Sequence, residues 1–224
     1  MSAEARPRCL DAAPTKIVCV GRNYAAHARE LGNDVPKEPL IFLKPPSALI
    51  GDGEAIVLPP QSSRVEYEGE IGVVLGRRLR GAGEAEARAA IRGIVCANDV
   101  TARDLQKSDG QWTRAKGFDT FCPVGPQVLD IGPPPRGFAL EALEVRCRVN
   151  GVERQHGRAR DMVFGIPALL AYISGVMTLE PGDLVLTGTP EGVGPLRPGD
   201  VVEVDISGVG VLRNPVRASG VGNG

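Results

Sequence analysis

Short apolar runs separated by glycine and proline dominate the pattern along this chain. Four of them predict short strands, because they are rich in β-branched and other apolar residues and are bounded by turn formers. They cover residues 16–21, 55–58, 182–187 and 200–204. With 29 Gly and 19 Pro in 224 residues, turns are frequent. The pattern therefore predicts a mainly β, α+β fold with few short helices.

Helical periodicity is confined to a few segments. It predicts helices over 23–31 and 84–93, a helical turn over 101–106, and a helix over 161–174 that begins with Asp161 as its cap. Two Pro-Gly-Asp sequences, at 181–183 and 198–200, suit type II turns that each lead into a strand. We expect one catalytic domain over 14–217, with flexible segments at 1–13 and 218–224.

The segment 64–75 has a strand-like pattern with glutamates at every second position, Glu66, Glu68 and Glu70. Side chains in a strand alternate between two faces, so these carboxylates are expected to share one face. Like charges this close repel, and either open water or a divalent cation would offset the repulsion. The apolar run that follows indicates an interior strand, which favours a cation or a basic partner.

Asp99 follows a second apolar run and precedes the helical turn at 101–106. It could cap that turn, the common role of Asp in this setting. Alternatively it adds a third carboxylate to the glutamates. Oxygen ligands without nearby His or Cys would select Mg²⁺, Mn²⁺ or Ca²⁺ over zinc.

The balance of charges indicates which kind of molecule the protein binds. The chain has 26 basic and 27 acidic residues and a net charge of −1, which gives no overall attraction to nucleic acid or to anionic membranes. A small molecule is the expected partner.

The five cysteines are scattered without a C-x-x-C pair, and neither a signal peptide nor an 18-residue apolar span is found. Reduced thiols and a cytoplasmic location are expected.

Several separated motifs resemble, in order, the signatures of the fumarylacetoacetate hydrolase family. They are Tyr67-Glu-Gly-Glu-Ile, Asn98-Asp-Val-Thr-Ala-Arg-Asp-Leu-Gln, Ala115-Lys-Gly-Phe-Asp-Thr-Phe-Cys-Pro-Val-Gly-Pro and Leu186-Thr-Gly-Thr-Pro-Glu-Gly-Val-Gly-Pro. The segments Val20-Gly-Arg-Asn-Tyr-Ala-Ala-His and Ile41-Phe-Leu-Lys-Pro resemble its short, single-domain branch, which contains acylpyruvate hydrolases and oxaloacetate decarboxylases. The resemblance covers about residues 15–217.

The resemblance implies a mixed β roll of the fumarylacetoacetate hydrolase C-terminal-domain type and a homodimer. It also implies that Glu68, Glu70 and Asp99 are metal ligands, with Mg²⁺ the expected ion and Mn²⁺ possible. Glu66 falls outside this ligand set. It would orient a neighbouring group or sit at the rim of the site without a role.

Three further residues are implied as catalytic. Lys116 occupies the family's lysine position, where a cation stabilises an enolate oxygen, although most lysines are simply exposed. His27 and Glu30 are spaced i and i+3, so their side chains can meet on one helix face. In the family such a pair orients or deprotonates the attacking water. The other histidine, His156, is expected in a turn without a role.

Substrate contacts are implied for Arg103, Gln106 and Thr189. A guanidinium suits a carboxylate through paired hydrogen bonds, but a surface salt bridge of Arg103 with Asp104 or a nearby acid is an equally ordinary alternative. Thr189 would help to bind a carboxylate. Lys44 is expected only to support the pocket wall.

The resemblance implies a metal-dependent hydrolase that cleaves acylpyruvates, such as acetylpyruvate or fumarylpyruvate, to pyruvate and a carboxylic acid. Decarboxylation of oxaloacetate passes through the same enolate and is the first alternative. Isomerisation or decarboxylation of 2-hydroxy-diene dioates is another. A non-catalytic protein that binds a metal or ligand on the same fold is an alternative of a different class.

Overall fold

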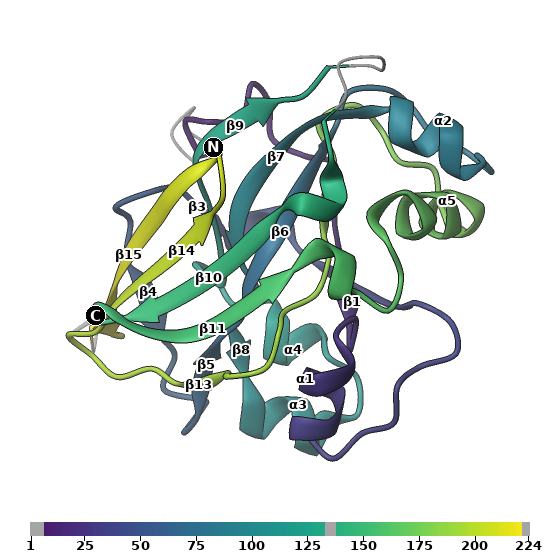
Figure 1. Ribbon diagram of the computed structural model, residues 1–224. Coiled ribbons are helices and arrows are strands. Elements are labelled where there is room, and N and C mark those ends of the chain that lie inside the picture. Colours follow the sequence, from purple (N-terminus) through teal and green to yellow (C-terminus); the bar gives the residue numbers. More distant parts are fainter. Residues whose placement is uncertain (1–6, 133–137, 221–224) are drawn as a thin grey trace.

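The computed structural model describes residues 7–132 and 138–220. These residues form three β-sheets, with short helices at their margins (Figure 1). Residues 1–6 and 221–224, which belong to the two segments predicted to be flexible, lie outside the described residues. Leu10, within the predicted N-terminal segment, is buried in an apolar cluster.

The largest sheet has seven strands and a hydrophobic cluster on each face. Its strands, in spatial order, are β2 (Leu40–Lys44), β1 (Ile17–Gly21), β12 (Leu184–Leu186), β6 (Gly69–Leu75), β7 (Ile91–Asn98), β9 (Cys122–Asp130) and β3 (Leu49–Ile50). Along β1, Val18 and Val20 belong to one cluster, whereas Ile17 and Cys19 belong to the other. This alternation explains why the central strands are apolar at nearly every position.

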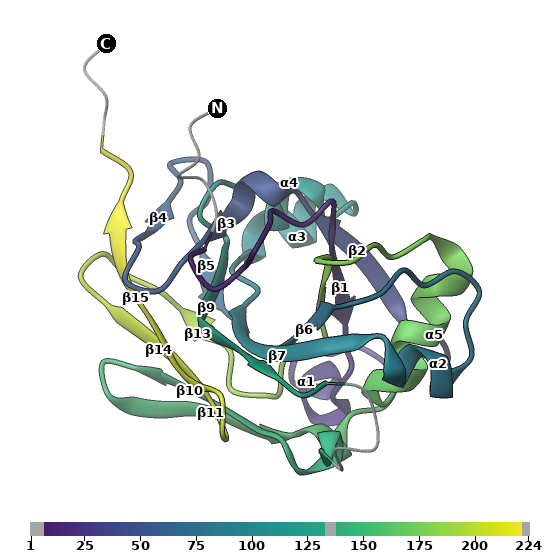
Figure 2. The same ribbon diagram turned by 90° about the horizontal axis from the view of Figure 1, so that it is seen from above.

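A five-stranded sheet covers one face of the seven-stranded sheet (Figures 1 and 2). Its strands are β11 (Val152–Arg158), β10 (Glu144–Val149), β14 (Val201–Ile206), β15 (Gly210–Ala218) and β4 (Ile56–Leu58). β10 and β14 alternate between buried and partly exposed positions, as expected for strands with one face on the core. The two sheets approach closely at Gly69, where a Cβ would lie 3.0 Å from the Cβ of Cys147.

The third sheet contains β13 (Gly194–Pro195), β5 (Val65–Tyr67) and β8 (Thr101–Ala102). The prediction of one continuous strand over 64–75 is therefore wrong, because the chain passes from this sheet to the seven-stranded sheet at Glu68. There two backbone N–H groups donate to side chains: Asn98 Oδ1 accepts the N–H of Glu68 at 2.9 Å, and Gln155 Oε1 accepts the N–H of Gly69 at 3.0 Å.

The helices are short and lie in two groups. They are α1 (Ala25–Glu30), α2 (Glu84–Ala89), α3 (Arg103–Asp109), α4 (Thr113–Lys116) and α5 (Ile166–Val176). α2 and α5 lie side by side, away from α1, α3 and α4 (Figure 1). Single 3₁₀ turns occur at Pro46–Ala48, Leu140–Ala142 and Ala159–Asp161. The prediction of a mainly β roll with few short helices is confirmed.

Three predicted helical segments have wrong boundaries. The turn predicted over 101–106 begins with the strand β8 and continues as α3 to Asp109. Asp161 ends a 3₁₀ turn and caps no helix, and α5 begins only at Ile166, with proline in its first turn. The helix predicted over 84–93 ends at Ala89, because β7 begins at Ile91. His156 lies within β11 and not in the predicted turn.

Both predicted type II turns are confirmed. Gly182 and Gly199 have φ values of +87° and +94°, which glycine adopts without a steric penalty. The turns close through N–H groups of Asp183 and Asp200, which donate to carbonyls three residues earlier at 3.0 and 3.1 Å. The four predicted strands correspond to β1, β4, β12 and β14.

The five cysteines are all free thiols, four of them buried. Within the described residues, every helix is too short or too polar to span a bilayer.

Candidate active site

Three acidic side chains meet where the seven-stranded and three-stranded sheets join. Glu68 lies between β5 and β6, Glu70 lies on β6, and Asp99 follows β7. Gly69 pairs with Asn98 across β6 and β7, so the register of these strands brings the carboxylates together. One oxygen of each residue lies within 4.8 Å of the others, and all three side chains are buried. We refer to Glu68, Glu70 and Asp99 as the carboxylate floor.

Two buried lysines neutralise part of this floor. Lys116, at the end of α4, places Nζ 2.7 Å from Glu68 Oε2 and 2.8 Å from Asp99 Oδ2. Lys44, at the end of β2, places Nζ 2.6 Å from the other oxygen of Asp99. The ammonium of Lys116 also lies 4.9 Å from the ring centroid of Phe42, within the range of a cation–π contact. Asp99 therefore pairs with two cations and is not the helix cap considered above.

Glu70 differs from the other two carboxylates in having no cationic partner among the described residues. Its Oε2 accepts the backbone N–H of Gly188 at 2.6 Å. Burial raises the pKa of Glu70 well above 4.5, and the charges of Asp99 and Glu68 raise it further. Burial also opposes ionisation of Glu68, but the charges of Lys116 and Arg103 outweigh it and lower its pKa.

The donor set fits a divalent metal ion. Three carboxylates converge, none of the floor residues is His or Cys, and one carboxylate lacks a positive partner in the described structure. Hard oxygen donors of this kind suit Mg²⁺ or Mn²⁺. Glu68, Glu70 and Asp99 are thus the residues that could hold the ion predicted from the sequence.

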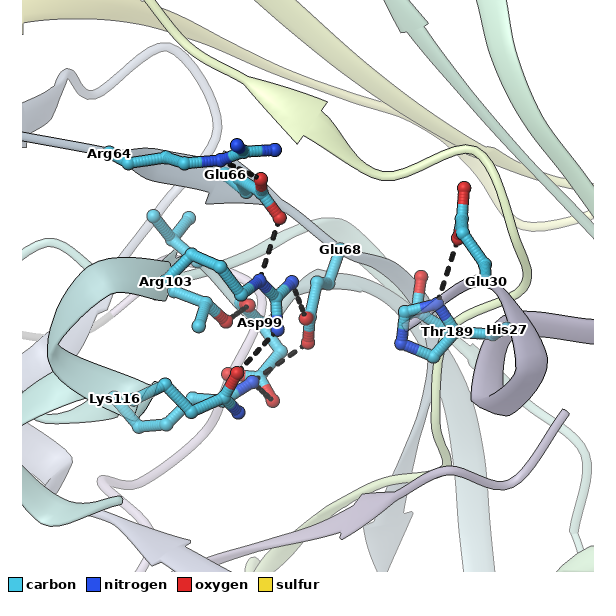
Figure 3. A network of polar contacts seen from close by, with 12 residues as sticks. His27, Glu30, Arg64, Glu66, Glu68, Asp99, Arg103, Lys116 and Thr189 are labelled. Atoms are coloured by element: carbon cyan, nitrogen blue, oxygen red, sulfur yellow. Dashed lines mark hydrogen bonds and ion pairs between the residues drawn. The ribbon is translucent and has the colours of Figure 1, made fainter. Parts of the chain in front are cut away.

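Glu66 and Arg103 form a buried ion pair beside the floor (Figure 3). Arg103 Nε donates to Glu66 Oε2 at 2.7 Å, and Nη2 donates to Glu68 Oε1. The other oxygen of Glu66 accepts from Arg64 Nε at 2.6 Å. Glu66 is therefore neither solvent-exposed nor a residue of the rim without a role, because it holds Arg103 against the floor.

The remaining contact of Arg103 is with Gln106, whose Oε1 accepts from Nη1 at 2.6 Å. The alternative of a surface salt bridge of Arg103 with Asp104 or a nearby acid is wrong, because its ion pairs are with Glu66 and Glu68 and are buried. Asp104 instead accepts hydrogen bonds from Ser62 and Ser63. Burial raises the pKa of Asp104, but these hydrogen bonds together outweigh it and lower the pKa to about 2.

His27 and Glu30 meet on α1, as their spacing predicts. His27 Nδ1 lies 3.2 Å from Glu30 Oε2, which leaves Nε2 as the ring nitrogen not used by Glu30. The backbone N–H of Gly192 donates to both oxygens of Glu30, at 3.0 and 3.2 Å. His27 is buried, whereas the side chain of Glu30 is 34% exposed. The pair lies across from Lys116 and Arg103 in Figure 3.

Thr189 is held at the start of β6, where the chain enters the seven-stranded sheet. Its hydroxyl donates to the carbonyl of Gly69 at 2.9 Å and accepts from Gln155 Nε2 at 2.8 Å. The hydroxyl hydrogen is therefore already engaged within the described structure. A substrate carboxylate at this position would depend on backbone N–H donors.

One cavity of about 540 Å³ unites these groups. Every predicted site residue lines it: His27, Glu30, Glu68, Glu70, Asp99, Arg103, Gln106, Lys116 and Thr189. Trp112 and Phe42 form an apolar part of its wall, with ring centroids 5.1 Å apart. Trp112 packs so closely on Gly21 that a Cβ there would lie 2.9 Å from the indole.

Two supporting residues were not predicted in these roles. Lys44 was expected only behind the pocket wall, but it is a buried counter-ion of Asp99. A lysine at the end of an apolar segment was the available signal, because a buried lysine needs an acidic partner. Gln155, which binds both Gly69 and Thr189, gave no local signal, since its partners are far away in sequence.

Comparisons with known proteins agree with the resemblance of the motifs. Residues 16–217 match the family described as Fumarylacetoacetate (FAA) hydrolase C-terminal. The chain is 46% identical to "Oxaloacetate tautomerase FAHD1, mitochondrial" of Arabidopsis thaliana over 87% of each chain. It is 44% identical to "Oxaloacetate decarboxylase, mitochondrial" of Dictyostelium discoideum, over 87% of this chain and 89% of that one.

A solved structure extends the comparison. The 2-hydroxyhepta-2,4-diene-1,7-dioate isomerase of Mycobacterium marinum is 46% identical to this chain and has a TM-score of 0.84. The match covers 94% of this chain and 77% of the isomerase. The similar proteins thus carry the names of a tautomerase, a decarboxylase and an isomerase.

Proposed function

Because this chain belongs to the fumarylacetoacetate hydrolase family, we propose that its carboxylate floor holds Mg²⁺ or Mn²⁺ and that the cavity binds a small 2-oxo acid. The observation that carries the proposal is the presence of the floor, Lys116 and the His27–Glu30 pair around one cavity. A bound divalent ion would act as a Lewis acid that holds the 2-oxo acid and draws electrons from its carbonyl group.

Lys116 is the group proposed to stabilise the enolate. Its buried ammonium is fixed by Glu68 and Asp99, so it needs no rearrangement to face negative charge that develops on a substrate oxygen. Arg103 and Gln106 are proposed to bind the polar groups of the substrate. The Glu66–Arg103 pair keeps that guanidinium in position.

The specific reaction that we propose is hydrolysis of an acylpyruvate, and the His27–Glu30 pair supports it. Glu30 holds Nδ1 of His27, and Nε2 accepts a proton from water as the oxygen attacks the distal acyl carbonyl. The carbon–carbon bond then breaks, its electron pair forms the enolate of pyruvate, and protonation of that enolate at carbon gives pyruvate. The acyl group leaves as a carboxylic acid.

Oxaloacetate is the substrate of the second candidate function, favoured by the names of two similar proteins. Loss of carbon dioxide leaves the same enolate without an attacking water. Tautomerisation moves one proton between carbon and oxygen, a step for which the free ring nitrogen of His27 is also suited. Isomerisation of a hydroxy-diene dioate would use similar proton transfers, as the name of the mycobacterial structure suggests.

A substrate panel tests the proposal. Purified protein with Mg²⁺ or Mn²⁺ is assayed on acetylpyruvate, fumarylpyruvate, oxaloacetate and a 2-hydroxy-diene dioate, with a chelator as control. We expect metal-dependent turnover that is abolished by the chelator. Metal binding without turnover of any compound would favour the non-catalytic alternative, and absence of both would refute the proposal.

We also propose that the chain forms a homodimer, as its family resemblance implies. Light scattering coupled to size-exclusion chromatography measures the mass directly. Twice the chain mass of 23.6 kDa is the expected value, and a value near 23.6 kDa would refute the dimer.

A further inference from the structure

Arg22 is a cation of the cavity wall that the proposed reaction does not yet use. It lies between β1 and α1 and is partly buried. Within the described residues its guanidinium has neither an ion pair nor a hydrogen bond, whereas Lys116 and Arg103 are each paired with carboxylates of the site. An unpaired guanidinium in a concave site is available for an anion from outside the chain.

The backbone at Arg22 is strained in a way that fixes this position. Its φ value is +58°, in a region that non-glycine residues seldom adopt. The neighbours on both sides are held firmly. Gly21 is packed against Trp112, and the Asn23 side chain donates to the carbonyl of Thr187 at 2.8 Å and accepts the N–H of Phe164 at 2.9 Å. Strain that the surroundings enforce in this way is typical of functional sites.

The charges around the cavity also favour an anion with more than one carboxylate. Five Lys and Arg side chains and four carboxylates line it, and three of the carboxylates form the floor. Arg103 already satisfies three acceptors, Glu66, Glu68 and Gln106. Arg22 and the exposed Lys107 are the two lining cations without an ion pair among the described residues.

We propose that Arg22 is a specificity residue that binds a second carboxylate, at the end of the substrate remote from the 2-oxo acid group. The protein then selects 2-oxo dicarboxylic acids over 2-oxo monocarboxylic acids. This inference rests on the proposed function, because it assumes that the first carboxylate and the 2-oxo group bind at the carboxylate floor. Paired hydrogen bonds from the planar guanidinium supply the selectivity.

A pair of ligands of equal length isolates this contact. 2-Oxoglutarate and 2-oxopentanoate each have five carbons, and they differ in a terminal carboxylate against a methyl group. Calorimetry in the presence of Mg²⁺ gives both dissociation constants. We expect the wild-type protein to bind 2-oxoglutarate on the order of 10- to 100-fold more tightly, the usual effect of a charge-assisted hydrogen bond.

Arg22→Asn should remove most of this preference and leave the affinity for 2-oxopentanoate unchanged. Asn is chosen because it tolerates a positive φ better than other polar residues, so the backbone is preserved. Arg22→Lys keeps the charge without the planar fork and should retain only part of the preference. Arg29→Asn is the matched control, because Arg29 is exposed on α1 and does not line the cavity.

Equal wild-type affinity for the two ligands would overturn the inference and leave the proposed function standing, as would an undiminished preference in Arg22→Asn. Failure of the wild-type protein to bind either ligand with Mg²⁺ would refute the proposed function, and the inference with it. Thermal melting shows whether Arg22→Asn is folded. If it is not, an undiminished preference in folded Arg22→Lys overturns the guanidinium contact.

Discussion

The carboxylate floor and the α1 wall, by which we mean His27 and Glu30 on α1, line the same cavity but are held in place by different forces. The floor comes from neighbouring strands and is tied by buried ion pairs to Lys44, Lys116 and Arg103. The wall is one helix of six residues without a side-chain cap, and its Glu30 is partly exposed. Substitutions in the floor should therefore affect folding and metal binding, whereas those in the wall should affect mainly the reaction.

Loss of Asp99 should break the floor most severely. Asp99→Asn leaves two buried ammonium groups with one fewer charged partner, which typically costs about 3–5 kcal/mol of unfolding free energy. Urea unfolding of the metal-free protein measures this cost, and calorimetry should detect no Mn²⁺ binding. Asp109→Asn, which removes an exposed pair with Arg114, should leave both measurements close to wild type. Wild-type stability of Asp99→Asn would show that these lysines do not depend on it.

A substitution in the wall should change the reaction and leave the floor intact. His27→Ala should lower the kcat for acylpyruvate hydrolysis by about 10²- to 10⁴-fold, because the proton acceptor is lost. Oxaloacetate decarboxylation, which needs no attacking water, should fall far less, and Mn²⁺ affinity should be unchanged. His156→Ala is the matched control, since His156 pairs with Glu144 outside the cavity. Equal losses on both substrates would contradict the assignment of His27 to water activation.

Within the floor, Glu70 should behave unlike Asp99. Glu70→Gln removes a buried carboxylate that has no cationic partner among the described residues, so the metal-free protein should become more stable. Metal affinity should nevertheless fall by more than about 100-fold, which exceeds the usual effect of losing a residue that only hydrogen-bonds to a metal ligand. Glu84→Gln, at an exposed position of α2, controls for the lost charge. Lower stability of metal-free Glu70→Gln would contradict this account.

The pH dependence of the metal-free protein sharpens the same point. The pKa of Glu70 is raised well above 4.5 in the folded protein. As the pH rises above 4.5, the unfolded chain releases this proton while the folded protein still holds it, so the free energy of unfolding falls. Glu70→Gln should lack this decline when urea unfolding is repeated at several pH values.

The smallest effect is expected at Glu30. Glu30→Gln keeps a hydrogen-bonding side chain beside His27 but removes its charge, so acylpyruvate hydrolysis should fall on the order of tenfold. Because the floor is untouched, Mn²⁺ affinity should equal that of the wild type by calorimetry. A loss as large as that of His27→Ala would mean that Glu30 does more than orient the ring.

The sequence predicted the residues that line the cavity better than the residues that support them. The motifs named nine residues that all line one cavity, because each motif carries its chemistry within a few positions. The supports depend on contacts between distant segments. Lys44 meets Asp99 55 residues away, and Gln155 meets Gly69 86 residues away. No local pattern encodes such pairs.

The same reason explains the errors in the fold. Short apolar runs bounded by turn formers predicted β1, β4, β12 and β14, because that signal lies within each segment. The alternation along 64–75 could not reveal the break at Glu68, because the residues on both sides continue the same alternation. At this break the N–H groups of Glu68 and Gly69 donate to the side chains of Asn98 and Gln155, which come from other segments.

Trp112, packed on Gly21 beside Arg22, has a practical consequence. It is the single tryptophan of the chain, and it lines the cavity in contact with Phe42. Its emission is therefore an intrinsic optical reporter of this one place in the molecule. Titrations with metal ions or 2-oxo acids can be followed without a label, and every change in signal originates at the wall of the site.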